Sequence, residues 1–181
     1  DHSSGRNYAK LRDYVDLAAD MGWEYSLVDA DWHMMQGGSI QELVEYANRK
    51  GVGILLWYNS GGPHTRVMNA GPRDRMYDRE VRRREMKKIS DWGVKGIKVD
   101  FFQSDKQETI QLYLDILQDA AEFGLLVNFH GCTLPRGWSR TYPHLMTMEA
   151  VRGAESYIFD ETYPEKAPCP ELSLAGSGSL G

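Results

Sequence analysis

The sequence has 181 residues, of which 41% are hydrophobic and 26% charged, an ordinary globular composition that argues against intrinsic disorder. A formal net charge of -5 and a pI near 5.5 argue against nucleic acids and anionic membranes as partners, because phosphate binding requires clustered Lys and Arg. No apolar stretch reaches the roughly 18 residues of a membrane-spanning helix. The one basic run, residues 79–88, is interleaved with Glu80 and Glu85 and is expected to form a solvated helix face.

One pattern occurs four times along the chain: an amphipathic helix, then a glycine, then an apolar strand that ends in polar residues. Helices are expected near residues 8–18, 39–47, 78–91 and 110–121. The second of them begins with Ser39 and Glu42, which are spaced as in a capping box. Strands are expected over residues 25–31, 54–59, 97–101 and 125–130, with a fifth over 145–149.

Helix and strand units in series indicate parallel strands with right-handed crossovers. Five strands are too few for an eight-stranded barrel, which takes about 250 residues. We therefore predict an α/β fold in which residues 1–168 form a partial (β/α)8 TIM barrel and residues 169–181 a flexible, non-matching tail. A doubly wound sheet is the alternative, although the glycine-rich phosphate loop that often accompanies it is absent.

The strand after Gly96 carries two charged residues on one face. Because side chains alternate along a strand, Lys98 and Asp100 point to one side, and Ile97, Val99 and Phe101 to the other. Enzymes with this architecture place their chemistry at the carboxyl ends of the strands, so Asp100 is a candidate catalytic residue. Lys98 would favour its ionised form. A buried ion pair that only fixes packing is the alternative.

Polar residues also end the other expected strands, namely Asp29, Asp31, Asn59, Asn128, His130 and Glu149. Aromatic residues such as Trp32 and Trp57 lie beside them, a mixture that suits sugars with their hydroxyl groups and C–H faces. Glycoside hydrolysis needs two carboxyl groups across the scissile bond, which Asp100 and a later Glu could supply. Each of these residues also has a structural alternative: a core position for Trp57, a cap or turn for Asp31, a structural hydrogen bond for His130.

Three motifs in this order, residues 96–101, 128–131 and 148–155, resemble the catalytic barrel of glycoside hydrolase family 97. In its retaining members, which are α-galactosidases, the resemblance implies Asp100 as the nucleophile and Glu155 as the acid/base. Inverting members, which are α-glucosidases, carry a glutamate that acts as the water-activating base where this sequence has Gly131. The resemblance therefore favours a retaining, exo-acting α-glycosidase acting on α-linked oligosaccharides or galactosides. An inverting α-glucosidase or an inactive carbohydrate-binding fragment is the alternative.

The resemblance also implies a calcium ion bound by Glu149 and Glu155, and a periplasmic or extracellular location. It implies that an N-terminal β-sandwich domain and the remaining barrel strands are missing from this chain. The residues expected to bind substrate are Lys98, Asp31, Trp32 and His130.

Overall fold

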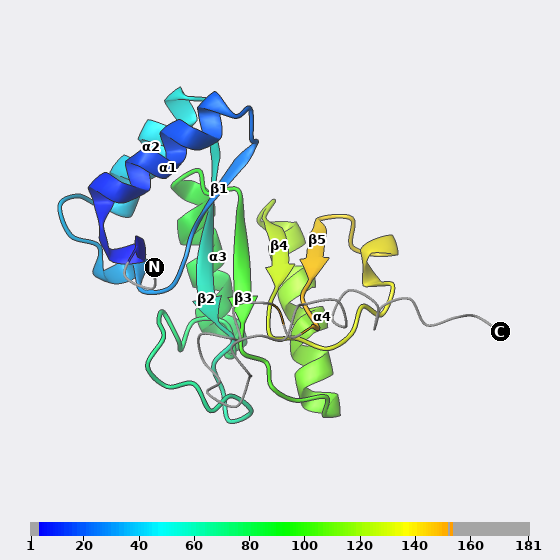
Figure 1. Ribbon diagram of the computed structural model, residues 1–181. Helices are drawn as coiled ribbons and strands as arrows, with labels where there is room; N and C mark the ends of the chain where they lie inside the picture. The colour runs from blue at the N-terminus through cyan, green and yellow to red at the C-terminus, as the bar shows by residue number, and fades with distance from the viewer. Residues whose placement is uncertain (1–3, 152, 154–181) are drawn as a thin grey trace, which may run out of the picture. The chain divides into compact units, whose positions relative to one another are not determined.

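Five parallel strands form one sheet in the order β1-β2-β3-β4-β5 (Figure 1). The computed structural model describes residues 4–151 and 153. The strands are β1 (Tyr25–Val28), β2 (Gly53–Asn59), β3 (Gly96–Asp100), β4 (Leu126–Phe129) and β5 (Leu145–Met148). Their order in space follows their order in the chain, whereas a doubly wound sheet reverses direction at a switch point. The sheet is therefore a segment of a (β/α) barrel, as predicted.

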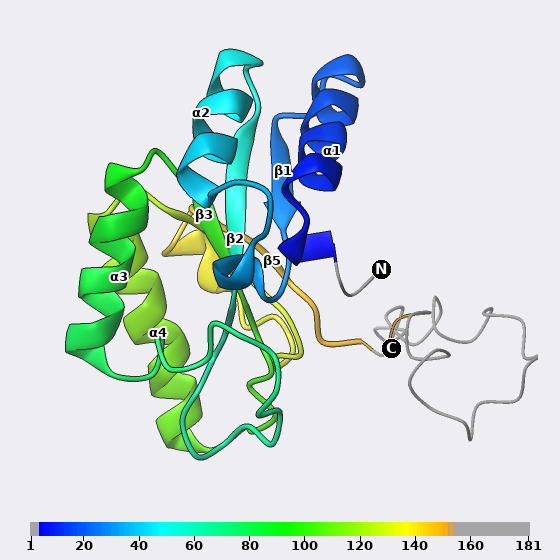
Figure 2. The ribbon, with the colours of Figure 1, turned by 90° about the vertical axis from the view of Figure 1, so that its left-hand side faces the viewer.

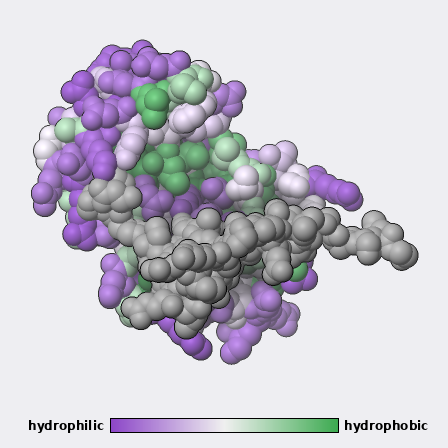
Figure 3. Space-filling view, in the orientation of Figure 1, coloured by the Kyte–Doolittle hydropathy of each residue, from purple (hydrophilic) through white to green (hydrophobic). Residues whose placement is uncertain are grey.

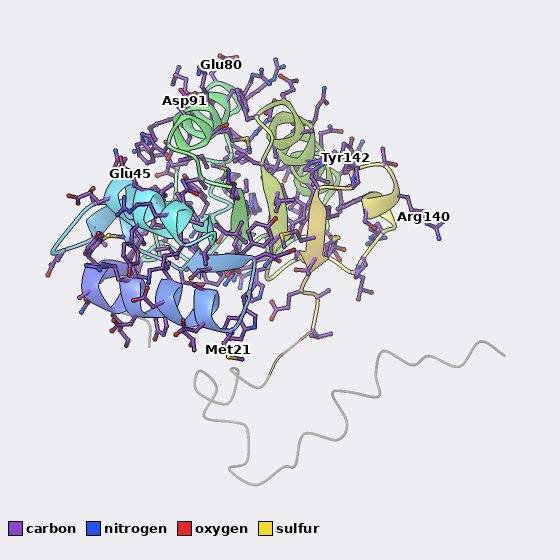
Figure 4. All side chains as sticks on the ribbon, turned by 90° about the horizontal axis from the view of Figure 1, so that it is seen from above. Met21, Glu45, Glu80, Asp91, Arg140 and Tyr142 are labelled. Atoms are coloured by element: carbon purple, nitrogen blue, oxygen red, sulfur yellow. The ribbon has the colours of Figure 1, made fainter. Side chains whose placement is uncertain are left out.

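Helix α1 (Tyr8–Asp20) precedes β1, and three helices connect successive strands: α2 (Ile40–Arg49), α3 (Arg79–Asp91) and α4 (Gln107–Glu122). The short 3-10 helices are η1 (Ser4–Arg6), η2 (Trp32–Met34) and η3 (Trp138–Arg140). Seen from above, the helices follow one another along the outer side of the strands (Figure 4). The capping box of Ser39 and Glu42 is present at the start of α2, as predicted. None of the helices among the described residues is long and apolar enough to cross a bilayer.

The core lies between the strands and the helices. Strand side chains that face the helices are fully buried: Ile54, Leu56, Ile97, Val99, Val127 and Phe129. Helix α2 contributes Leu43, Val44 and Ala47 to the same core, at the helical spacing expected for one apolar face. Burial of these side chains is the main stabilising contribution to this layer.

The inner face of the sheet changes from apolar to polar along the strands. Near the amino ends, Leu27 pairs in register with Leu55, and two residues later Trp57, Lys98, Asn128 and Thr147 form one row across four strands. Figure 3, in the same view as Figure 1, shows a hydrophobic area beside the hydrophilic surface of the helices. Both ribbon views place the long loop after β2 at the carboxyl ends of the strands (Figures 1 and 2). Polar inward-facing residues and loops therefore meet at one end of the sheet.

The basic run on α3 is not wholly solvated, contrary to expectation. Arg82 is 1% exposed, and its guanidinium donates to Asp119 of α4 at 2.7 Å and to the carbonyl of Met76 at 3.0 Å. Arg83 binds the other oxygen of the Asp119 carboxylate. Arg82 is therefore buried with its guanidinium paired, and its ion pair with Asp119 connects α3 to α4.

Replacing Asp119 by Ala is expected to destabilise the protein by about 3 kcal/mol or more, because Arg82 is left as an unpaired buried charge. Urea unfolding followed by tryptophan fluorescence would measure the change. Asp115→Ala on the same helix is the control: this carboxylate accepts from the exposed Gln111, and we expect a loss of no more than about 0.5 kcal/mol. Equal effects of the two substitutions would contradict a stabilising role for the buried pair.

Candidate active site

Asp100, the last residue of β3, is 6% exposed and lies among hydrogen-bond donors. The indole N–H of Trp57 donates to its Oδ2 at 3.2 Å, and the backbone N–H of Phe101 donates to its Oδ1 at 2.7 Å. The Nδ1 of His130 lies 3.5 Å from Oδ2, and the Nζ of Lys98 3.8 Å from it. Each carboxylate oxygen thus has its own donors, so the plane of the carboxylate is fixed.

The backbone turns sharply directly after Asp100. Phe101 has φ 65°, in the left-handed region, which ends the strand and directs its N–H back at the carboxylate. Its ring then lies against Trp57 on the inner side of the sheet, with ring centroids 5.8 Å apart. The expectation that Phe101 faces the core with Ile97 and Val99 was therefore wrong, because strand alternation stops at Asp100. Phe102 occupies the core instead, stacked on Tyr113.

The surroundings of Asp100 favour its ionised form. Burial alone would raise the pKa of Asp100, but His130, then the positive charge of Lys98, and the Trp57 hydrogen bond outweigh it and lower the pKa below its usual value. The same contact with Asp100 raises the pKa of His130 against the opposing effect of burial. A buried carboxylate that remains charged at neutral pH is the form required of a nucleophile.

Lys98 connects Asp100 to the residues that follow β1. Its Nζ donates to Asp29 Oδ2 at 3.0 Å, while remaining 3.8 Å from Asp100 Oδ2. The side chain of Lys98 is 11% exposed and that of Asp29 48%. Asp29 is thus a partly open carboxylate, and its oxygen is available to solvent or to a bound hydroxyl group.

His130 and Glu149 extend the polar group across β4 and β5. The Nδ1 of His130 lies 3.2 Å from Glu149 Oε2, and this oxygen also accepts the backbone N–H of Gly131 at 3.1 Å. His130 thereby stands between the carboxylates of Asp100 and Glu149. Four residues predicted from the sequence, Lys98, Asp100, His130 and Glu149, are therefore brought together at the carboxyl ends of three neighbouring strands.

Gly131 lies against the carboxylate of Asp100. Its φ is 49°, and a Cβ at this position would lie 2.9 Å from Asp100 Oδ1 and 3.3 Å from the backbone nitrogen of Phe101. A contact of 2.9 Å essentially never occurs at a real Cβ atom, so a neighbour would have to move. A side chain at residue 131 and the observed position of Asp100 are thus mutually exclusive.

Two other predicted site residues do not join this group. Trp32 is 5% exposed, packs edge-on against Tyr58 and donates its N–H to the carbonyl of Trp57. Asp31 pairs with Arg6 at 2.6 Å and accepts the N–H of Gly71 at 3.0 Å, so it holds the loop after β2. The placement of Trp32 and Asp31 favours structural roles, and contact with a sugar stays a prediction for both.

Glu155 lies outside the described residues, as do the predicted domain end at residue 168 and the tail 169–181. Calcium takes about six to eight oxygen ligands. Glu149 offers one carboxylate, and among the described residues no group of three or more His, Cys, Asp or Glu side chains could hold a metal ion. The described residues alone therefore do not make a calcium site.

A cavity of about 310 Å³ lies between the loops after β3 and β4. Its lining residues are Gln103, Ser104, Asp105, Gly131, Cys132 and Thr133. The N–H of Gln103 donates to the carbonyl of Gly131 at 3.5 Å, a contact that joins the two loops.

For Trp57 the sequence left two roles open, a core position and a contact with sugar. Its position in the sheet could have decided between them. Trp57 lies two residues before Asn59 on β2, so both side chains point to the inner face, and Trp57 pairs directly with Lys98 of β3. Knowledge of that pairing would have placed Trp57 on the inner face, beside the strand that carries Lys98 and Asp100.

The order of strands and this cluster of polar residues agree with the comparison to known families. The family model Glycoside hydrolase 97 matches residues 1–151. The chain belongs to glycoside hydrolase family 97. This finding confirms the resemblance deduced from the motifs that contain Asp100, His130 and Glu149.

Three named proteins are similar to this chain. A probable retaining alpha-galactosidase of Streptomyces bingchenggensis is 38% identical over 167 residues, which cover 86% of this chain and 24% of that protein. A retaining alpha-galactosidase of Bacteroides thetaiotaomicron is 30% identical over 164 residues, covering 86% and 22%. The crystal structure of a beta-arabinopyranosidase superposes with a TM-score of 0.80 and 50% identity, covering 86% of this chain and 25% of that one. The chain thus spans about a quarter of the length of these relatives.

Proposed function

We propose that the intact protein containing this chain is a retaining, exo-acting glycoside hydrolase for sugars of the α-galactose configuration. Asp100 attacks the anomeric carbon, and the glycosidic oxygen leaves with a proton from Glu155. Glu155 then deprotonates a water that attacks the same carbon, and the bond to Asp100 breaks. Lys98 and His130 hold Asp100 ionised and contact substrate hydroxyl groups.

The observation that supports this proposal most strongly is the close packing of Gly131 against the carboxylate of Asp100. The carboxylate is buried, held by donors on both oxygens, and kept charged by its neighbours. According to the resemblance, inverting relatives have at position 131 a glutamate that acts as the general base. In this chain Asp100 Oδ1 occupies the space that a side chain at residue 131 would need. A nucleophile at 100 therefore excludes a base at 131, which supports retention of configuration.

β-L-Arabinopyranosides are a second substrate class, favoured by the 50% identity to a beta-arabinopyranosidase. β-L-Arabinopyranose has the ring configuration of α-D-galactopyranose and lacks its hydroxymethyl group. A site that positions Asp100 for one sugar therefore positions it for the other. Discrimination depends on the space and the polar groups around one carbon substituent.

The test is an assay of the intact protein with p-nitrophenyl α-D-galactoside, β-L-arabinopyranoside and α-D-glucoside. We expect kcat/KM for one of the first two sugars to exceed that for the glucoside by about 100-fold or more, because a site that hydrogen-bonds a hydroxyl group rejects a sugar that leaves its polar groups unpaired. Proton NMR of the first product should show the anomer of the substrate. Release of the opposite anomer would identify an inverting enzyme, and binding without hydrolysis would indicate an inactive carbohydrate-binding module.

Calcium binding by Glu149 and Glu155 is a further proposal, taken from the resemblance. In the intact protein it requires oxygen ligands beyond the described residues, which the N-terminal β-sandwich domain implied by the resemblance would contribute. Calcium would supply electrostatic stabilisation beside the leaving group. A periplasmic or extracellular location is likewise an expectation from the resemblance.

A further inference from the structure

We propose that Trp57 is a positioning residue for Asp100, whose indole N–H promotes release of the sugar from the covalent glycosyl-enzyme. The inference rests on the proposed function of Asp100 as a nucleophile. It adds a residue to the reaction that the sequence motifs did not single out.

Trp57 is held rigidly under the carboxylate. Its side chain is 1% exposed, its ring contacts Phe101, and its backbone carbonyl accepts the indole N–H of Trp32 at 2.7 Å. Its own Nε1 lies 3.2 Å from Asp100 Oδ2. A buried indole N–H needs an acceptor, because an unsatisfied buried donor is costly. The acceptor here is the carboxylate that the reaction uses.

The N–H of Trp57 interacts differently with the two forms of Asp100. In the free enzyme it donates to a full carboxylate charge, and hydrogen bonds to charged groups are about twice as strong as those between neutral ones. In the glycosyl-enzyme one oxygen of Asp100 is bonded to the anomeric carbon, so the group is a neutral ester and a weaker acceptor. The N–H therefore stabilises the carboxylate relative to the ester.

This difference favours the second chemical step. When water attacks the anomeric carbon, the bond between this carbon and Asp100 breaks, and its electron pair returns to the carboxylate. Developing charge on that oxygen is stabilised by the preorganised N–H of Trp57. The same N–H slightly opposes the first step, in which the carboxylate loses its charge, but it orients the attacking group.

Loss of the N–H should therefore make the glycosyl-enzyme accumulate. For Trp57→Phe we expect kcat to fall about 10-fold, the low end for a hydrogen bond to a charged group. KM should fall in similar proportion, because the accumulating intermediate saturates the enzyme. The ratio kcat/KM, which reports the first step, should change much less.

The experiment uses the intact protein, with Trp57→Phe and the matched control Trp92→Phe. Trp92 caps the C-terminus of α3, packs partly buried against the core and lies under the Nζ of Lys88, and no contact joins it to Asp100 among the described residues. Quenched-flow measurement of the p-nitrophenol burst and mass spectrometry of the quenched enzyme would quantify the covalent species on Asp100. The burst should approach one equivalent for Trp57→Phe and stay smaller for wild type and for the control. Replacement of Trp57 by β-(3-benzothienyl)alanine removes the N–H at nearly constant shape and should give the same result.

A fall in kcat with unchanged KM and no covalent species would overturn the inference, since it would indicate a smaller fraction of folded enzyme. Unchanged kinetics of both Trp57 variants would overturn it as well. Failure of the proposed function is recognised separately, because wild-type protein would then hydrolyse none of the glycosides or would give the inverted anomer.

Discussion

Replacing Asp100 by Ala in the intact protein is expected to lower kcat by roughly 10⁴-fold or more, as removal of a covalent nucleophile does in other enzymes. The expectation follows from the position of the carboxylate at the end of β3, where Trp57 and the Phe101 N–H orient it. Substrate affinity should change far less, because sugar hydroxyl groups retain their other partners. Steady-state assays on the preferred p-nitrophenyl glycoside would measure the loss.

Chemical rescue separates a nucleophile from a structural aspartate. Removal of the side chain leaves space on the face of the sugar that Asp100 attacks, so a small anion such as azide should restore turnover and form a glycosyl azide of inverted configuration. Asp91→Ala is the control, since this exposed carboxylate pairs with Lys87 on the outer surface of α3. Normal turnover by Asp100→Ala, or inactivity of both variants, would contradict the assigned role.

Most secondary structure was predictable because it depends on local periodicity. The apolar spacing in the helices and the apolar runs of the strands identified all four α-helices and five strands among the described residues, but not the short 3-10 helices. Strand ends were less predictable: β1 ends at Val28 rather than near Asp31, because Asp31 adopts φ 68° and bonds to the loop after β2. Such ends depend on contacts with distant segments, which periodicity does not encode.

The candidate site was predictable to the extent that strand order dictates it. Lys98, Asp100, His130 and Glu149 end neighbouring parallel strands, so their proximity follows from the fold. Two features depend on tertiary contacts instead. The indole of Trp57 reaches Asp100 through strand pairing, and Arg82 is buried because Asp119 lies across the helix interface. Neither partner is close in sequence.

Gly131→Ala is expected to reduce kcat/KM by about 100-fold, the effect of displacing a reacting group by about 1 Å. Its Cβ would lie 2.9 Å from Asp100 Oδ1, and the backbone N–H of Phe101 holds that oxygen from the other side. The carboxylate must therefore move away from its donors. Kinetics on the intact protein would measure the loss, and labelling of Asp100 by a mechanism-based cyclitol should slow in parallel.

Gly137→Ala is the matched control for backbone strain. Gly137 has φ 75°, and a Cβ there would have no neighbour within 4 Å, so this substitution imposes the left-handed strain without touching Asp100. Both variants should lose about 1 to 2 kcal/mol of stability from the positive φ. Activity should fall only in Gly131→Ala. Equal activity of the two variants would mean that Asp100 tolerates a neighbour at 131, and position 131 would then no longer distinguish a nucleophilic mechanism from one that uses a base at that residue.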